Sequence, residues 1–289
     1  MTCIMKLYQN KQNKRISQVK VMNITTLNKK DILDKFNNID EKMLITRVLD
    51  KAVRAAKSWT ASWTDFLDPY QIRLVERVLR SINDIEYRFE GGYNGAERMI
   101  VIFEPAHLSD LSGYSSENPL SLINIKPKRE SNITHRDYLG SLMSLGIKRE
   151  KIGDIIVESE SCSVVVLKDI ATYILYNLSK VSNIGVDVIE GKIGDLKVAE
   201  PKTKEIKCTV PSLRLDCIVS NGFGISRSKL APLFKSGKVY VNWEPEESLS
   251  ARIKEGDMIS VKGKGRVVLD QIGNKTRKDR ISIVLKRFV

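Results

Sequence analysis

The sequence is short of several residue types, and each shortage argues against a class of protein. It has only two histidines, which leaves little room for a mechanism that needs a histidine cluster. The four cysteines form no Cys-x-x-Cys pair and have no neighbouring histidine, so a zinc site or a disulfide scaffold is not expected. No apolar run approaches the roughly 18 residues that identify a transmembrane helix, and we expect none.

Glycine-rich nucleotide loops are missing as well. No Gly-x-Gly-x-x-Gly follows a predicted strand, which argues against the cofactor site of a methyltransferase. The glycine-rich segment 91–95 lies between two β-prone runs. A strand and not a helix follows its glycines, so it lacks the helix start that binds phosphate. We expect a hairpin over residues 85–104 instead.

What the chain has in excess is positive charge. Lys and Arg total 48 against 35 Asp and Glu, for a net charge of +13. Residues 1–30 carry seven basic and no acidic residues, and residues 206–289 carry 17 basic and 8 acidic residues. Such an excess in a folded segment indicates a polyanionic partner, most commonly nucleic acid. We interpret residues 1–30 as a flexible basic arm, with a transit peptide as an alternative.

Residues 31–84 are predicted to be a helical N-terminal region. Apolar residues recur every three or four positions from Ile45 to Ala56, which is typical of an amphipathic helix. Asp68-Pro69 predicts the start of a second helix, because aspartate caps helices and proline suits the first helical position. Trp59 and Trp63 lie four residues apart and are expected to pack in the core.

The region 85–190 is expected to form one domain that joins the hairpin to a β-α-β-β-α-β pattern. That order is typical of ferredoxin-like and RNA-recognition folds. Its strands lack the aromatic residues on which an RNA-recognition motif stacks bases. We therefore predict a second RNA surface made of basic residues that contact phosphate: His135, Arg136, Lys148, Arg149 and Lys151. Polar residues 191–205 are predicted to be a linker.

Residues 206–289 predict a small αα-then-β module. Its second helix begins at Ser226, and free backbone N–H groups and cations at that point would bind an anion. Glycines between the later cations would let a phosphate backbone approach closely. The candidate RNA-binding residues of this pattern are Ser226, Arg227, Ser228, Lys229, Lys235, Lys238, Lys262, Lys264 and Arg266.

Three motifs make the sequence similar to a known family. RLDCIVSNGFGISRSKLAPLFKSGKVYVNW, followed by IKEGDMISVKGKGRVVL, resembles the RNA-binding domain named after small-subunit ribosomal protein four, here the S-four domain. Upstream, GGYNGAER and THRDYLGSLMSLGIKREKIGDI resemble the YlmH family, known in cyanobacteria and plastids as the photosystem II S-four domain protein. The resemblance covers residues 40–289.

The resemblance implies a ribosome-associated protein whose middle region is a second RNA-binding domain. It also implies RNA contact at Arg214 and Asn242, besides the residues of the second helix. The residues themselves leave other roles open. Arg214 could pair with Asp216, Asn242 could close a turn after a strand predicted over 239–243, and Trp243 could stack on a base.

We therefore expect an α+β protein with a helical N-terminal region, a ferredoxin-like, RNA-recognition-like middle domain and a C-terminal S-four-type domain. The expected function is non-catalytic binding of structured rRNA or tRNA on the ribosome, in translation quality control or ribosome assembly, with an implied link to photosystem II biogenesis. No cofactor and no membrane insertion are expected. We expect a cytoplasmic monomer, or a protein of the plastid stroma in a eukaryote.

Two rival functions come from other classes of protein. Pseudouridine synthases often carry an S-four domain, and Arg214-Leu215-Asp216 is similar to the context of their catalytic aspartate. Here that tripeptide lies inside the predicted binding domain itself, which argues against the enzyme. The second rival is a protein-interaction adaptor that would use the acidic-leaning middle region.

Overall fold

The computed structural model describes residues 22–23, 28–58, 60–83, 85–105, 118–130, 132–196, 198 and 203–288. The side chains at 22, 23, 227 and 228 are not part of this description. Most of the predicted arm 1–30, as well as Trp59, lies outside it. The chain divides into two compact units, Met1–Val198 and Ala199–Val289, and each is described by itself.

The first unit begins with a helical region, as expected. Helices α2 (Lys29–Leu33), α3 (Ile39–Ser58) and α4 (Pro69–Leu79) are present. Asp68 and Gln71 form a capping box at the start of α4, and Pro69 is its first residue. Helices α3 and α4 bury their apolar faces in one core, with Leu49 and Val75 fully enclosed.

Short strands interrupt this region, which the sequence did not predict. Strand β1 (Met22–Asn23) pairs in parallel with β3 (Ile82–Asn83). Strand β2 (Ser62–Trp63) lies between α3 and α4 and pairs with β5 (Ile100–Glu104). Trp63 is 36% exposed, so the expectation of a core position for this residue was wrong.

The predicted hairpin forms from β4 (Glu86–Glu90) and β5, in the sheet order β2-β5-β4. Its second strand serves two cores because side chains alternate along a strand. Val101 and Phe103 pack with α3 and α4. Ile100 and Ile102 pack against the middle domain. The packing therefore has no boundary at residue 85, where the sequence placed one.

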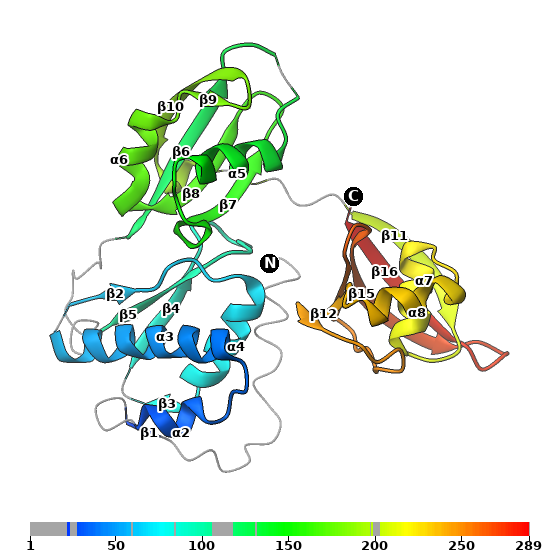
Figure 1. Cartoon of the computed structure of the whole chain (residues 1–289). Helices are drawn as coiled ribbons and strands as arrows, with labels where there is room; N and C mark the ends of the chain where they lie inside the picture. Colours follow the sequence, from blue (N-terminus) through cyan, green and yellow to red (C-terminus); the bar gives the residue numbers. More distant parts are fainter. Residues whose placement is uncertain are drawn as a thin grey trace. The chain divides into compact units, whose positions relative to one another are not determined.

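The middle domain has the expected β-α-β-β-α-β order. Its elements are β6 (Leu120–Pro127), α5 (His135–Ser144), β7 (Ile152–Val157), β8 (Cys162–Leu167), α6 (Lys168–Asn177) and β10 (Ile184–Gly191), with the two-residue strand β9 (Lys180–Val181). The sheet is antiparallel with the order β7-β8-β6-β10-β9. This is the ferredoxin-like arrangement, and Figure 1 shows α5 and α6 beside its strands.

Helix starts in this domain follow the sequence, while part of the predicted linker does not. Thr134 donates its backbone N–H and its hydroxyl to Asp137, which caps the start of α5. The segment 191–205, predicted to be a linker, contains a short 3-10 helix, η3 (Ile193–Asp195). Ile193 and Leu196 pack against the middle sheet. The first half of this segment is therefore part of the folded unit.

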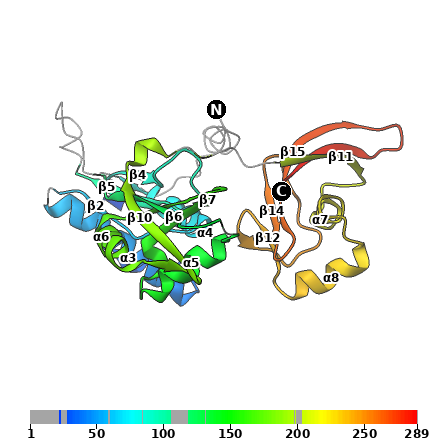
Figure 2. The ribbon, with the colours of Figure 1, turned by 90° about the horizontal axis from the view of Figure 1, so that it is seen from above.

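The second unit is a six-stranded sheet with two helices on one face. The helices are α7 (Leu215–Phe223) and α8 (Arg227–Lys235), and the strands are β11 (Thr203–Val210), β12 (Val239–Val241), β13 (Glu244–Pro245), β14 (Met258–Val261), β15 (Gly265–Lys275) and β16 (Ile281–Phe288). The sheet order is β11-β16-β15-β14-β12-β13. Figure 2 shows α7 and α8 on the same side of these strands.

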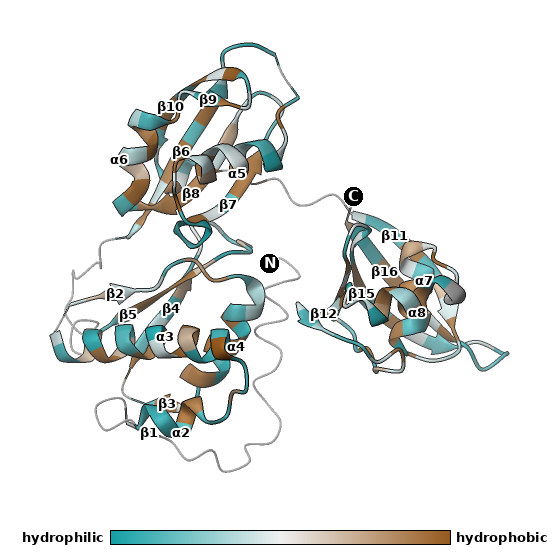
Figure 3. Ribbon diagram, viewed as in Figure 1, coloured by the Kyte–Doolittle hydropathy of each residue, from teal (hydrophilic) through white to brown (hydrophobic). Residues whose placement is uncertain are grey.

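This arrangement confirms the α+β class, and strands follow the two helices as predicted. However, β11 precedes the helices and begins within the segment predicted to be a linker, and one strand is shorter than predicted. The strand expected over 239–243 ends at Val241, because Asn242 and Trp243 have φ angles of 52° and 67° and form a turn. The core beneath the helices holds Leu215, Ile218 and Phe234. Figure 3 shows hydrophobic residues along the strands and hydrophilic residues at the tip between β15 and β16.

Candidate nucleic-acid interface

The two helices of the second unit are positioned by glycines at their ends. Helix α7 ends at Gly224, which has a φ of 65° and donates its N–H to the Ser220 carbonyl. Within α7, a Cβ at Gly222 would lie 3.1 Å from both Val267 methyl groups, so glycine lets the helix pack closely on the sheet. Ser226 is the N-cap of α8, and Gly237, with a φ of 62°, follows its end. The chain thus returns directly from α8 into β12.

Five lysines lie on the surface around α8 and the turn from β14 to β15. We call this set the lysine edge: Lys229, Lys235, Lys238, Lys262 and Lys264. All five are exposed. The Lys262 N–H donates to the Lys238 carbonyl at 2.9 Å, which brings the end of α8 next to the turn. Gly263 in that turn has a φ of 79°, a conformation that favours glycine.

The charges of the lysine edge are not neutralised within the described part of the chain. No ion pair or side-chain hydrogen bond there involves any of the five ammonium groups. Lys229 lies in the first turn of α8 and Lys235 at its last residue. At about 1.5 Å per residue the two backbone positions are about 9 Å apart along the helix. The edge therefore runs along α8 from its first turn to its last residue and on to the turn from β14 to β15.

Three other candidates have partners within the chain. Arg214 donates from Nε and Nη2 to the two carboxylate oxygens of Asp216, at 3.2 and 3.0 Å. The hydrogen bonds that Arg214 donates to Asp216, together with the negative charge of that carboxylate, raise the pKa of Arg214. Asn242 donates from Nδ2 to Asp257 at 2.8 Å, and its Oδ1 accepts the Met258 N–H at 3.1 Å. Arg214 thus pairs with Asp216, and Asn242 closes the turn after β12, as the residues themselves had left open.

Arg266, the third, lies on the other face of the sheet. It pairs in register with Ser260, whereas the next residue, Val267, lies in the core beneath the helices. Its guanidinium carbon is 5.4 Å from the centre of the Phe288 ring. Arg266 is thus separate from the lysine edge. Arg227 and Ser228 begin α8, but their side chains lie outside the described part.

The turn between β15 and β16 carries cations that the sequence-based prediction missed. Arg277 and Lys278 are exposed at its tip. Lys275 pairs with Asp279 at 2.7 Å. Arg280 donates from Nε to the Thr209 hydroxyl at 3.0 Å, which holds the base of the tip. The basic run KTRK, residues 275–278, was the signal that could have identified it.

In the middle domain, two of the five residues predicted to contact RNA have partners within the chain. Arg149 donates from Nη1 to the Ile152 and Gly153 carbonyls, the latter at 3.1 Å. Burial and the charge of Arg98 lower the pKa of Arg149 to about 10. Lys151 pairs with Asp169 at 2.8 Å and with Asp65 at 3.0 Å. These pairings outweigh its desolvation and raise the pKa of Lys151.

The remaining three lie on the surface but do not form one cluster of free cations. Arg136 and Lys148 are exposed, and no side-chain partner is described for either. His135 begins α5. Partial desolvation and then the charge of Arg149 lower the pKa of His135, so its imidazole is neutral at pH 7. A neutral imidazole contributes no charge to phosphate binding.

The GGYNGAER and REKIGDI motifs meet at a joint between the hairpin and the middle domain. Asp154 accepts the Tyr93 hydroxyl at 2.8 Å, the Glu97 N–H at 2.7 Å and the Arg98 N–H at 3.1 Å. Arg98 also donates to the Ile152 and Phe66 carbonyls at 3.1 and 3.2 Å. Burial and the Asp154 charge raise the pKa of Tyr93. These two motifs therefore hold the first unit together.

A ferredoxin-like domain joined to an αα-then-β module is an architecture of proteins built from small nucleic-acid-binding folds. Comparison with known proteins is more specific. A family model described as "YlmH, N-terminal" matches residues 40–108, and one described as "Putative RNA-binding domain in YlmH" matches residues 115–195. The chain belongs to the YlmH family.

Two bacterial proteins illustrate the similarity. "Ribosome-associated protein quality control protein P2" of Bacillus subtilis (strain 168) is 31% identical over 258 residues, which cover 89% of this chain and 98% of that protein. The structure of "Cell division protein ylmH from Streptococcus pneumoniae" is 18% identical, with a TM-score of 0.47. The match to it covers 55% of this chain and 96% of that one.

Two further features of the described residues concern other classes of protein. No helix among them is long and apolar enough to cross a membrane. No group of three or more His, Cys, Asp or Glu side chains among them is placed to hold a metal ion. Asp216, which the rival enzyme hypothesis would make catalytic, accepts hydrogen bonds from Arg214 and from the Cys217 N–H.

Proposed function

We propose that this protein binds structured ribosomal or transfer RNA on the ribosome through the lysine edge of its second unit. The observation that carries the proposal is the contrast between the five exposed lysines, whose ammonium groups have no described partner, and Arg214 of the same unit, which is paired. Unpaired ammonium groups on a rigid surface bind phosphate without first breaking an internal ion pair.

The relatives favour the same function. The B. subtilis protein is named for ribosome-associated quality control, and the family model for the middle domain is named for RNA binding. We place the present protein in translation quality control, with ribosome assembly as the alternative, and without a catalytic step. We take the working state to be a cytoplasmic monomer, or one of the plastid stroma in a eukaryote. No residue of the site bears on the link to photosystem II.

Sedimentation with ribosomes tests this proposal. The wild-type chain should pellet with ribosomes through a sucrose cushion at moderate salt and be released at high salt. The variant Lys235→Gln/Lys238→Gln/Lys262→Gln should remain mostly in the supernatant. The matched variant with arginine at the same three positions keeps the charge and should pellet. Equal pelleting of the glutamine variant and the wild type would refute the lysine edge as the binding surface.

A further inference from the structure

The middle sheet has one face that its own helices leave uncovered. Helices α5 and α6 pack on the face that carries Ile123 and Val164. In RNA-binding domains of this fold, the opposite face is the platform for nucleic acid. Whether that face is free in this protein decides where the middle domain can contact RNA.

Half of the platform is closed by the N-terminal region. Leu120, Leu122 and Val165 on this face are buried against Phe66 and Ile102. The contact is close: a Cβ at Gly153 would lie 2.6 Å from the Phe66 ring, so only glycine fits there. The joint centred on Asp154 holds the two parts together. RNA has no access to this half of the sheet.

The far half of the platform remains open. Asn124 pairs in register with Ile189 on one side and with Ser163 on the other, so these three side chains share the face. Ile189 is 63% exposed, and the Ser163 hydroxyl donates to Asn124 at 2.9 Å. Beyond these three residues, β6 ends in a loop that carries positive charge, and β7 joins β8 through a tight turn that carries negative charge.

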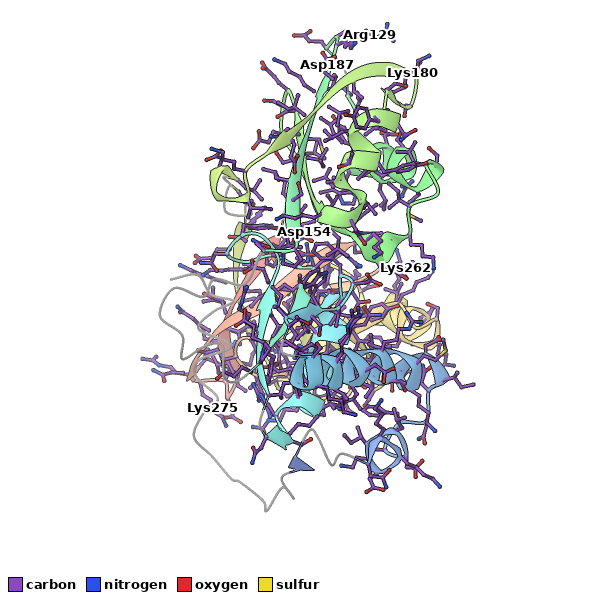
Figure 4. The ribbon with its side chains drawn as sticks, turned by 90° about the vertical axis from the view of Figure 1, so that its left-hand side faces the viewer. Arg129, Asp154, Lys180, Asp187, Lys262 and Lys275 are labelled. Carbon is purple, nitrogen blue, oxygen red and sulfur yellow. The ribbon has the colours of Figure 1, made fainter. Side chains whose placement is uncertain are left out.

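Four cations lie at this end of the domain, in β6, in the loop that follows β6, and in β9. We call them the distal edge: Lys126, Lys128, Arg129 and Lys180. Gly185 lies between two of them, since its carbonyl accepts the Lys128 N–H at 2.9 Å and its backbone pairs with Lys180. Figure 4 shows Arg129, Lys180 and Asp187 at the end of the domain away from Asp154.

Part of this charge is balanced, since Asp187 also pairs in register with Lys126, and the exposed Glu130 follows Arg129. Lys128 pairs with Asp187 at 3.1 Å. For Lys126, Arg129 and Lys180, all exposed, the structure describes no side-chain partner. The acidic residues Glu158 and Glu160 lie in the turn between β7 and β8, at the opposite edge of the sheet. The end of the domain is therefore polarised, with its positive side next to the open half of the platform.

We propose that the distal edge is a second RNA-binding surface, which holds the phosphates of an RNA strand that continues over the open half of the platform. This inference rests on the proposed function, because it assumes that the chain binds RNA. It replaces the second surface expected from the sequence, where Arg149 and Lys151 are committed to internal contacts.

The test compares three variants of the full chain in binding an rRNA fragment that has a hairpin and a single-stranded flank. The distal-edge variant is Lys126→Gln/Arg129→Gln/Lys180→Gln. The matched control, Arg47→Gln/Arg54→Gln/Lys57→Gln, removes the same charge from exposed positions of α3. The third is the lysine-edge variant, Lys235→Gln/Lys238→Gln/Lys262→Gln. Thermal melting checks that each variant is folded.

We expect the distal-edge variant to bind the RNA fragment about tenfold more weakly than the wild type. The magnitude of its slope of log K against log salt should be smaller by about three, one for each lost phosphate contact. The α3 control should bind like the wild type. Equal affinities of the distal-edge variant and the control would overturn this inference, while a loss in the lysine-edge variant alone would leave the proposed function standing. A distal-edge variant that loses ribosomes but not RNA would assign the surface to a protein partner and overturn it too.

Discussion

The joint at Asp154 and the lysine edge use the same kinds of residue for opposite purposes. At the joint, Arg98 and Lys151 donate to carbonyls or carboxylates of distant segments, and Arg149 donates to the nearby Gly153 carbonyl. At the lysine edge, the ammonium groups have no such partner among the described residues. Whether a basic residue of this chain is paired within the fold or left exposed without a described partner thus depends on what the fold places beside it, and its type alone does not decide.

The comparison also concerns the motifs of the sequence. The segments GGYNGAER and REKIGDI, which led to the family, build the joint. Their glycines serve close packing, since a Cβ at Gly91 would lie 2.3 Å from that of Ala96. The lysine edge lies within the two segments that resemble the S-four domain. Recognisable motifs therefore build both the joint and the candidate surface, and the two differ in whether their charged side chains have partners within the chain.

The largest effect should follow from removing the centre of the joint. Asp154→Ala leaves the Tyr93 hydroxyl and two N–H groups without their acceptor, and we expect the free energy of unfolding to fall by about 3 kcal/mol. Denaturant titration measures it. The control is Glu160→Ala, which removes an exposed carboxylate and should change stability little. An equal loss in both variants would contradict a structural role for Asp154.

A smaller effect is expected at Arg149. Arg149→Gln removes hydrogen bonds to two carbonyls and should lower the free energy of unfolding by about 2 kcal/mol, while RNA affinity of the folded protein is unchanged. Lys148→Gln, its exposed neighbour, should leave stability unchanged. Loss of RNA affinity without loss of stability in the Arg149 variant would return this residue to the binding surface.

The smallest effect concerns pH. The pKa of His135 is lowered in the folded state, so the unfolded chain takes up its proton first as the pH falls through about 6.5. His135 therefore contributes less to the free energy of unfolding at pH 5.5 than at pH 7.5. Relative to His135→Gln, the wild type should be less stable at pH 5.5 than it is at pH 7.5. Denaturant midpoints at the two pH values measure this shift, and a shift of opposite sign would contradict a lowered pKa.

The order of the elements could be predicted from the sequence, and their partners could not. Periodicity and turn residues identified α3, α4, the hairpin and the β-α-β-β-α-β order, because these depend on local patterns. The double burial of β5 depends on a sheet formed later in the chain, which no window of sequence contains. Lys151 is similar, since its partners Asp65 and Asp169 are far from it in sequence.

The candidate site was predicted in part for the same reason. Lys229, Lys235 and Lys238 were identified by charge and lie on the surface, as a solvated lysine does by default. The role of Asn242 could not be decided from the sequence. Its φ of 52° is held by hydrogen bonds of its side-chain amide to Asp257 and Met258, which lie 15 and 16 residues further along the chain. The distal edge was not identified, since Lys180 is distant in sequence from Lys126, Lys128 and Arg129 and lies near them only through the sheet.

The most direct test of the central claim is the salt dependence of RNA binding by the full chain. For wild type and for Lys235→Gln/Lys238→Gln/Lys262→Gln, log K for one structured rRNA fragment is measured against log salt. We predict that the variant binds on the order of 30-fold more weakly at moderate salt, with a slope smaller by about three. A variant whose slope and affinity equal those of the wild type would contradict the claim that these unpaired lysines bind RNA phosphates.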